Sequence, residues 1–235
     1  GQAQGQRVAI GSIEPGLAAR IAGAGLPLRR HGAGWCVEGA LDAGLERIAR
    51  WLDAHALCSR WRDELLDVVA ESGAVVGRVE RAAARVLGLT TRAVHLVGRT
   101  AGGGTWVQQR AFGKATDPGL WDTTMGGLVA TGESIADTLA RETREEAGLA
   151  IEELRELESC GRITIRRPVD DGYMVEHIEI FQALVPDRLE PVNQDGEVER
   201  FECLEADALR ARLRAGAFTL EAALILLHRS ASATP

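Results

Sequence analysis

Aromatic side chains are scarce in this sequence, at 4% of its 235 residues, although tryptophan accounts for five of them. The sequence also lacks an apolar run of the roughly 20 residues that a membrane-spanning helix requires. Its first residues contain no apolar region of the signal-peptide kind. We therefore expect a cytoplasmic protein that has no membrane partner.

Paired cysteines and an excess of basic residues are missing as well. No Cys-x-x-Cys pair or zinc-ligand spacing occurs, which predicts buried free thiols at four scattered positions: Cys36, Cys58, Cys160 and Cys203. The formal net charge of −7 argues against a nucleic-acid polymer as partner, because phosphate backbones attract basic surfaces. Local basic pairs such as Arg29-Arg30 leave a small phosphorylated ligand open.

Residues 1–90 are expected to form a small, mainly helical N-terminal domain. Apolar side chains at helical spacing predict helices over residues 15–24 and 41–57. A third helix is expected around Trp61 to Val69, and a fourth over residues 78–87, ended by Gly88 as a C-cap. A short strand is expected at residues 35–37, between glycines.

Residues 91–235 have a different pattern, in which strands alternate with a few helices. Residues 93–98 and 105–109 predict a hairpin around the turn Gly102–Gly104. Further strands are expected at 162–166, 175–185 and 198–204, and helices at 134–147, 206–215 and 219–228. The order predicts an α+β or three-layer α/β/α domain.

The helix expected at 134–147 has carboxylates in an unfavourable place. Glu142, Glu145 and Glu146 repel one another at spacings of three and four residues, and the last two lie where the helix dipole favours cations. Arg141 relieves only part of this charge by pairing with Glu145. At about 100° per residue, Glu146 falls at the edge of the expected buried stripe, which comprises Ile135, Ala136, Leu139, Ala140, Thr143 and Ala147.

Local rules that are broken in a cluster indicate a functional site. A hard divalent cation removes this conflict, because Mg²⁺ binds oxygen ligands and shares its coordination shell with substrate phosphates. The alternative is a solvated acidic helix end with one i,i+4 ion pair.

The wider spacing around this helix decides between these readings. The pattern Gly127-x5-Glu133-x7-Arg141-Glu142-Thr143-x-Glu145-Glu146-x-Gly148-Leu149 resembles the Nudix box. Only Thr143 departs from it, at a position where the family prefers an aliphatic residue. The resemblance implies a Nudix α/β/α sandwich with a mixed sheet and a hydrolase that cuts a diphosphate linkage with Mg²⁺ or Mn²⁺.

By this resemblance, Glu145, Glu146 and the carbonyl of Gly127 are metal ligands. Glu142 is a further ligand or the base that activates water, and Arg141 orients a catalytic carboxylate. Glu133 supports the loop or reaches a metal through water. Gly126 lets the backbone approach the diphosphate, and Gly148 ends the helix.

The family frequently recruits one more carboxylate from outside the box. Glu197 is our first candidate for it, with Glu199 and Glu179 behind it. An ordinary surface role stays open for each of these three acids.

A narrower resemblance covers most of the chain. Residues 94–98, 106–116, 118–122 and 195–199 are similar to one Nudix branch, in which a helical N-terminal domain of unknown function precedes the hydrolase. That branch includes the Nudix part of fungal thiamine pyrophosphokinase fusions. It implies thiamine diphosphate, or an oxidised or damaged analogue, as the substrate that is cut to the monophosphate. Arg110 and Lys114 then become candidates for contacts with the diphosphate, whereas Trp121 and Asp122 are expected to close their loop onto the core.

Other functions stay open beside this one. The first alternative is a hydrolase of a nucleoside diphosphate linked to another group, such as ADP-ribose or a nucleotide sugar. Residues 108–111 and 118–121 are also similar to isopentenyl diphosphate isomerases, but the Cys and His that follow the tryptophan there are missing after Trp121. A non-catalytic binding protein is disfavoured by the complete set of box glutamates. Many relatives are homodimers, so the resemblance leaves a homodimer open.

Overall fold

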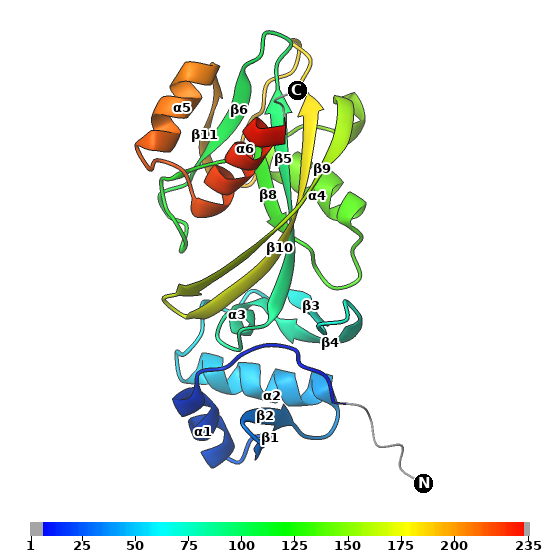
Figure 1. Cartoon of the computed structure of the whole chain (residues 1–235), viewed down its shortest axis with the longest axis vertical. Helices are drawn as coiled ribbons and strands as arrows, with labels where there is room; N and C mark the ends of the chain where they lie inside the picture. Colours follow the sequence, from blue (N-terminus) through cyan, green and yellow to red (C-terminus); the bar gives the residue numbers. More distant parts are fainter. Residues whose placement is uncertain (1–6, 233–235) are drawn as a thin grey trace. The chain divides into compact units, whose positions relative to one another are not determined.

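The computed structural model describes residues 7–232 and consists of two compact units (Figure 1). The first unit runs up to Thr91 and also contains residues 130–132 and 164–177. The second unit contains Arg92–Val129, Glu133–Ile163 and the residues from Ile178 onwards. The division after Thr91 lies one residue from the boundary expected from the sequence, but two later segments join the first unit.

The first unit combines helices with two separate two-stranded sheets. The helices are α1 (Pro15–Gly23), α2 (Leu41–Ala54) and the short α3 (Arg81–Ala84). The strands are β1 (Leu28–His31), β2 (Gly34–Val37), β3 (Leu65–Val69) and β4 (Val75–Glu80). The pairs β1–β2 and β3–β4 are antiparallel.

Two of the helices and one strand expected in this unit are confirmed. Pro15 occupies the first turn of α1, and the Glu14 carboxylate caps the helix by accepting from the N–H groups of Gly16 and Leu17. The α2 helix buries one apolar face, including Ile48 and Leu52. The strand expected at residues 35–37 is β2.

The expectation of a mainly helical N-terminal domain is wrong between Trp61 and Leu87. Residues 65–69 and 75–80 form the β3–β4 hairpin, and only Arg81–Ala84 are helical. The alternating burial of Leu66 and Val68 is the period of a strand. Valine favours a strand over a helix, because its branched Cβ is restricted against the preceding helical turn. Short apolar runs of this kind fit both periodicities, so their spacing alone was ambiguous.

The second unit is built on a seven-stranded sheet with the order β11-β6-β5-β10-β9, in which β7 pairs with β6 and β8 pairs with β5. The strands are β5 (Thr90–Arg99), β6 (Thr105–Arg110), β7 (Trp121–Asp122), β8 (Met125–Leu128), β9 (Arg155–Val169), β10 (Gly172–Leu184) and β11 (Val198–Leu204). The helices are α4 (Ile135–Ala147), the 3₁₀ turn η1 (Ile151–Glu153), α5 (Ala206–Arg214) and α6 (Leu220–Ser232). Every strand and helix expected after residue 90 is present, and β9 is longer than expected.

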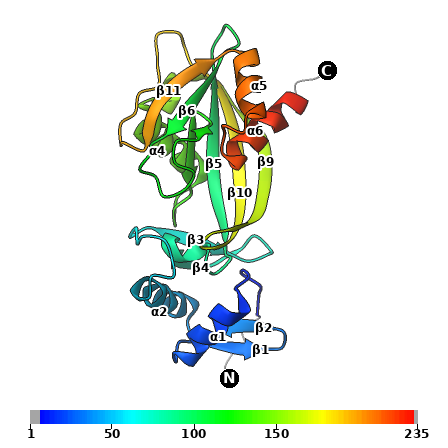
Figure 2. The ribbon, with the colours of Figure 1, turned by 90° about the vertical axis from the view of Figure 1, so that its left-hand side faces the viewer.

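Helices cover both faces of this sheet. In Figures 1 and 2, α4 lies on one side and α5 and α6 lie on the other, which confirms the α/β/α arrangement with a mixed sheet. The core under α4 consists of buried apolar side chains: Val94, Leu96, Met125, Val129, Leu139, Ala147, Leu149, Leu154, Ala183 and Val185. Burial of this apolar surface supplies the main force that holds α4 against the sheet.

Strand register determines which backbone groups face α4. The β8 strand pairs antiparallel with β5, with Gly127 opposite Val94 and Gly126 opposite His95. The β11 strand pairs antiparallel with β6, and the N–H of Ala111 donates to the carbonyl of Glu197 at 3.0 Å. The Glu197 loop is thereby tied to the end of β6.

The α4 helix begins and ends as its sequence predicts. Ser134 and Asp137 form a reciprocal capping box, and Gly148 ends the helix in the left-handed conformation, with φ of 66°. Its buried face differs from the expected stripe at two positions, because Ala136 is exposed and Thr138 is buried. The buried face is therefore turned toward Thr138 and Glu146.

The surface and the thiols agree only partly with the expectations. All four cysteines are free as expected, but Cys203 is exposed and the other three are half-buried.

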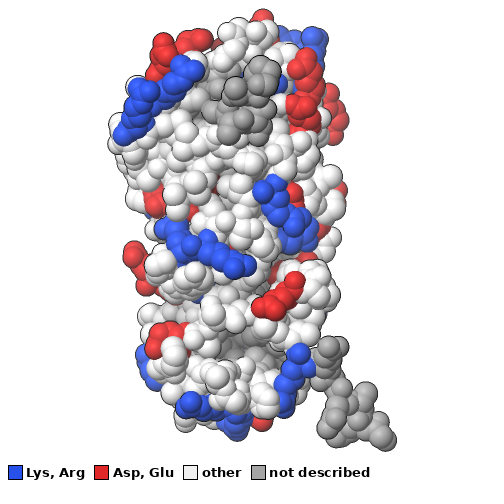
Figure 3. Space-filling view, viewed as in Figure 1, with Lys and Arg blue, Asp and Glu red and all other residues white. Residues whose placement is uncertain are grey.

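No helix within residues 7–232 has the length and apolarity needed to cross a membrane. On the face drawn in Figure 3, the described basic side chains lie in small groups among acidic ones.

We expect Ser134→Ala to destabilise the second unit by about 1 kcal/mol, because the N–H of Asp137 loses the acceptor that caps α4. Chemical denaturation followed by far-UV circular dichroism measures this change. Ser134→Thr, which keeps the hydroxyl acceptor, is the matched control. Equal stability of the alanine variant and the wild type would show that the capping box does not hold this helix.

Candidate active site

One guanidinium group binds three carboxylates of the expected site. Arg141 donates through Nε and Nη2 to the two oxygens of Glu133, both at 2.8 Å. Its Nη1 donates to Glu142 at 2.9 Å and to Glu145 at 3.0 Å. The hydrogen bonds to Glu133 make the largest contribution to raising the pKa of Arg141, against the effect of burial. The sequence predicted only the pair with Glu145.

Glu133 joins the loop before α4 to the helix itself. Besides binding Arg141, it accepts from the hydroxyl of Thr138 at 2.8 Å. Thr138 lies in the first turns of α4 and also donates to the carbonyl of Ser134. The side chain of Glu133 thus links the loop to the helix, which fits the first of the two roles that the resemblance left open.

Glu146 is the buried acid of the cluster, with only 3% of its surface exposed. One of its oxygens accepts from Nε2 of Gln108 at 2.9 Å and from the N–H of Gly126 at 3.1 Å. Burial raises the pKa of Glu146 to about 8; the nearby charge of Lys114 and the bond from Gln108 oppose this rise, and Glu142 adds to it. The expectation that Glu146 is not fully solvated is confirmed.

Two glycines of β8 let carboxylates approach the backbone. A side chain on Gly127 would collide with the carboxylate of Glu142, so Glu142 lies directly against the Gly127 backbone. Gly126 gives its N–H to Glu146, and the imidazole of His95 lies against its Cα. The glycines are needed here for close approach.

The loop cation Lys114 pairs with Glu197, the candidate carboxylate from outside the box. Lys114 forms an ion pair with Glu197, and its charge also acts on Glu146. Glu142 in turn acts on Glu146. The structure therefore brings Glu197 and Lys114, far apart in the sequence, to the buried carboxylate of the box.

Three other candidates have different partners. Arg110 donates from Nε and Nη2 to the carbonyl of Thr116 and pairs with buried Asp122 at 3.4 Å, so its geometry supports holding the loop rather than binding a diphosphate. Glu179 pairs with Arg162. Glu199 is exposed at an irregularity in β11. Trp121 and Asp122 are buried, as expected.

Sequence reasoning missed the supporting residues Gln108 and His95. Gln108 is buried on β6, and its Oε1 has no hydrogen-bond partner among the described residues. The Nδ1 atom of His95 lies 2.8 Å from the hydroxyl of Thr123. A glutamine and a histidine inside otherwise buried strands were the available signals, because buried polar side chains need partners.

The chemistry of these donors fits a hard divalent cation. Glu142 and Glu146 of α4 lie against the glycine backbone of β8, and the buried Glu146 lacks a full counter-charge, which such a cation supplies. Among residues 7–232, no group of three acidic, histidine or cysteine side chains already surrounds a single point. Arg141 holds the carboxylates of Glu142 and Glu145, and Gln108 holds that of Glu146.

The domain is an α/β/α sandwich in which the carboxylates of α4 lie against the two glycines of β8. This arrangement defines a class of protein suited to metal-assisted chemistry on phosphates. The family is shown by the sequence itself. Residues 89–224, more than half of the chain, match the model of the NUDIX domain, and the chain therefore belongs to the Nudix family. Nudix hydrolases generally use divalent metals such as Mg²⁺ or Mn²⁺.

Individual relatives agree with this family. An uncharacterised Nudix hydrolase of Pseudomonas aeruginosa is 40% identical over 93 residues, which cover 40% of this chain and 55% of that protein. An isopentenyl-diphosphate Delta-isomerase of Rhodobacter capsulatus is 34% identical over 143 residues, which cover 60% of this chain and 78% of the isomerase. A crystal structure from Deinococcus radiodurans is similar with a TM-score of 0.58 and 25% identity, covering 71% of this chain and 98% of that one. The chain spans about half the length of the first curated relatives that it matches.

Glu146 makes the stability of the metal-free protein depend on pH. Its pKa is raised from 4.5 to about 8 in the folded state, so the folded state binds more protons than the unfolded state between these values. Stability therefore falls as the pH rises from about 5 to about 8. We expect Glu146→Gln to match the wild type near pH 5 and to exceed it by a few kcal/mol, in order of magnitude, above pH 8.

Denaturant titrations of both proteins in EDTA across this pH range measure the difference. Glu145→Gln, at an exposed position, is the control and should show a much smaller pH-dependent difference. A constant difference between wild type and Glu146→Gln would contradict the buried, proton-binding state of Glu146.

Proposed function

We propose that this protein is a metal-dependent hydrolase that cuts the diphosphate linkage of a small organic diphosphate. The observation that carries the proposal is the arrangement of three acids of α4. Glu142 lies against the Gly127 backbone, Glu146 is buried beside Gly126, and Arg141 holds Glu145 next to Glu142. A structural surface would place these acids in water, where their repulsion is weak. Here the fold instead buries Glu146 and holds Glu142 and Glu145 beside each other through Arg141.

The ligands in this proposal are Glu142, Glu145, Glu146, the carbonyl of Gly127 and, from outside the box, Glu197. Mg²⁺ or Mn²⁺ bound there supplies charge neutralisation for the diphosphate and lowers the pKa of a bound water. The short list of hard oxygen donors matches the preference of Mg²⁺. Whether Glu142 binds metal or accepts the proton of the attacking water stays open, as in the family.

The chain's own residues have separate tasks in this reaction. Arg141 holds Glu142 and Glu145 at fixed orientations, so that neither carboxylate has to be ordered when substrate binds. Gln108 and the Gly126 N–H hold Glu146 in the same way. Lys114 is the cation on this loop that can exchange its partner Glu197 for a phosphate oxygen.

For the substrate, we favour thiamine diphosphate or an oxidised analogue, cut to the monophosphate. The support is the similarity of residues 106–116 and 195–199 to the thiamine-associated Nudix branch. Lys114 and Glu197, one from each of these segments, form an ion pair beside the box. A nucleoside diphosphate linked to another group is the alternative within the same chemistry.

Isomerase activity is the second candidate, because 34% identity links the chain to an isopentenyl-diphosphate isomerase. The residues after Trp121 are Asp, Thr, Thr, Met, Gly and Gly, so the thiol and the imidazole that follow this tryptophan in the isomerases are missing. The imidazole of His95 reaches Thr123 from β5, but no thiol accompanies it in this stretch. Hydrolysis is therefore preferred.

Glu145→Gln is expected to lower kcat by roughly 10²-fold or more, because it replaces a negatively charged carboxylate of the proposed metal site with a neutral amide. Glu145 is half exposed and, among the described residues, it pairs with Arg141 alone, so the fold should survive the substitution. Phosphate release with added Mg²⁺ or Mn²⁺, and with EDTA, measures the effect. Glu152→Gln, at an exposed position of η1, is the matched control. Full activity of Glu145→Gln with saturating metal would reject the proposed metal site.

Thiamine diphosphate, or its oxidised analogue, is expected to have a higher kcat/KM than ADP-ribose, nucleotide sugars and nucleoside triphosphates. A substrate panel compares these kcat/KM values by the phosphate that is released. A coupled phosphatase frees phosphate from products that do not release it directly. Isopentenyl diphosphate belongs in the same panel, assayed for dimethylallyl diphosphate. A preference for nucleotide sugars would support the nucleotide alternative, and isomer formation would support the second candidate.

A further inference from the structure

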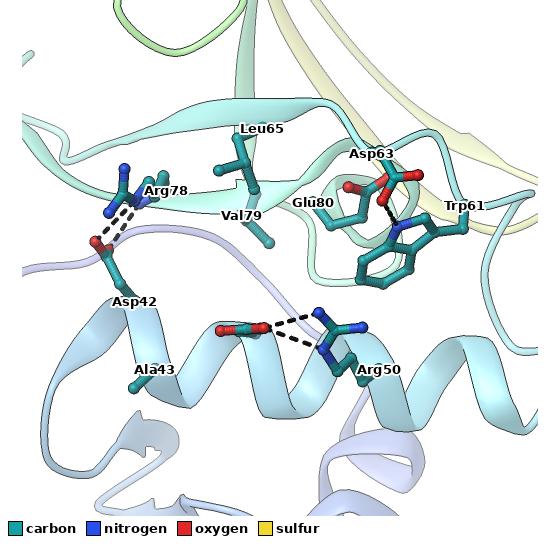
Figure 4. Close-up of a pocket in the computed structure, with 10 residues that line it drawn as sticks. Asp42, Ala43, Arg50, Trp61, Asp63, Leu65, Arg78, Val79 and Glu80 are labelled. Carbon is teal, nitrogen blue, oxygen red and sulfur yellow. Dashed lines mark hydrogen bonds and ion pairs between the residues drawn. The ribbon is translucent and has the colours of Figure 1, made fainter.

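The first unit has a cavity of its own, with a volume of about 520 Å³. Residues of α2 line one side, and the β3–β4 hairpin with the residues before it lines the other (Figure 4). All the lining residues belong to the first unit, whereas the Nudix-box residues other than 130–132 belong to the second. The volume is in the range of sites for small molecules.

Charge in this cavity is unbalanced. Four carboxylates and two guanidiniums line it: Asp42, Glu46, Asp63, Glu80, Arg50 and Arg78. The two arginines already have partners, since Arg78 pairs with Asp42 at 3.2 Å and Arg50 with Glu46 at 2.9 Å. The excess of two negative charges is therefore carried by Asp63 and Glu80, which lie on the same side of the cavity as Trp61 (Figure 4).

Glu80 is unusual among these acids because it is buried, with 3% of its surface exposed. Its Oε1 accepts from the N–H of Arg62 at 2.9 Å. The fold thus holds this carboxylate in place at the wall of the cavity, with little access to bulk water, where a cation in the cavity can pair with it.

Trp61 provides a flat apolar surface next to these acids. Its indole N–H donates to Asp63 at 2.6 Å, which holds the ring in place. The guanidinium of Arg50 lies 5.1 Å from the ring centroid, so one cation already uses this ring. Leu65 and Val79 add apolar surface to the lining.

We propose that this cavity binds a small organic cation, with an ammonium or amidinium group at Glu80 and Asp63 and a flat or apolar body against Trp61. The excess negative charge disfavours an anion, and the apolar wall favours an organic cation over a hydrated metal ion. The proposal concerns the first unit alone and is independent of the reaction proposed for the second.

Isothermal titration of the full-length protein at pH 7 and about 150 mM salt tests it with three matched probes. Tryptamine carries the cation, tryptophol replaces the ammonium with a hydroxyl, and indole-3-acetate carries the opposite charge. We expect tryptamine to bind and the other two to bind at least about tenfold more weakly, because only the cation pairs with the buried carboxylate.

Two conservative variants locate the site. Glu80→Gln keeps an acceptor for the N–H of Arg62, and Asp63→Asn keeps an acceptor for the indole of Trp61, so both preserve the local hydrogen bonds. Each is expected to weaken tryptamine binding by about tenfold or more. Glu71→Gln, an exposed acid of the same unit, and Glu145→Gln, in the acidic cluster of the second unit, should leave it unchanged.

Circular dichroism of Glu80→Gln and Asp63→Asn establishes that the variants are folded. Three results would overturn the proposal. They are the absence of tryptamine binding to the wild type, equal binding of tryptophol, and a loss of binding in Glu145→Gln without one in Glu80→Gln. A loss confined to the two pocket variants supports it, whatever substrate the hydrolase unit proves to cut.

Discussion

Glu133, Glu142 and Glu145 all accept hydrogen bonds from the one guanidinium of Arg141, and the second unit is organised around this contact. Without it, two acids in the second half of α4 would repel each other, one of them in the last turn, where the helix dipole already opposes negative charge. The planar fork of arginine can serve several carboxylates at fixed angles, which the ammonium of lysine cannot. Arg141 thereby converts a repulsive helix end into an ordered set of carboxylate oxygens.

The burial of Glu146 adds a second conflict that Arg141 does not relieve. Its carboxylate accepts hydrogen bonds from Gln108 and the N–H of Gly126 and is attracted by the charge of Lys114. Its pKa nevertheless rises to about 8. Metal-binding and catalytic sites commonly hold perturbed acids of this kind, because the same burial that costs stability strengthens electrostatic contacts with a bound ion. The two glycines of β8 complete the arrangement, since any larger residue at Gly127 would displace Glu142.

The helix of the Nudix box and its acids were predictable because the sequence signals for them are local. The capping box at Ser134, the left-handed Gly148 and the carboxylate spacing each depend on residues within one helix. The hairpin of β3 and β4 was not predictable in this way, because Leu65 to Val69 fit a helix and a strand about equally and the choice depends on a partner strand. The partners of Arg110 were not predictable for the same reason, since Thr116 and Asp122 are brought to it by the folded loop.

The sequence by itself determined the family, the helix that carries the acids and the identity of those acids, because a helix places residues three and four apart on neighbouring positions without help from the rest of the chain. The helical period also indicated that Glu146 is the least solvated of them. Only the tertiary structure decided how deeply this acid is buried, which distant residues contact the acids and where the first unit forms a cavity. Gln108 donates to Glu146, the charge of Lys114 acts on the same carboxylate, and Glu80 and Trp61 line one cavity, all through strand pairing and loop closure. Such contacts depend on register and packing between segments, which no local periodicity encodes.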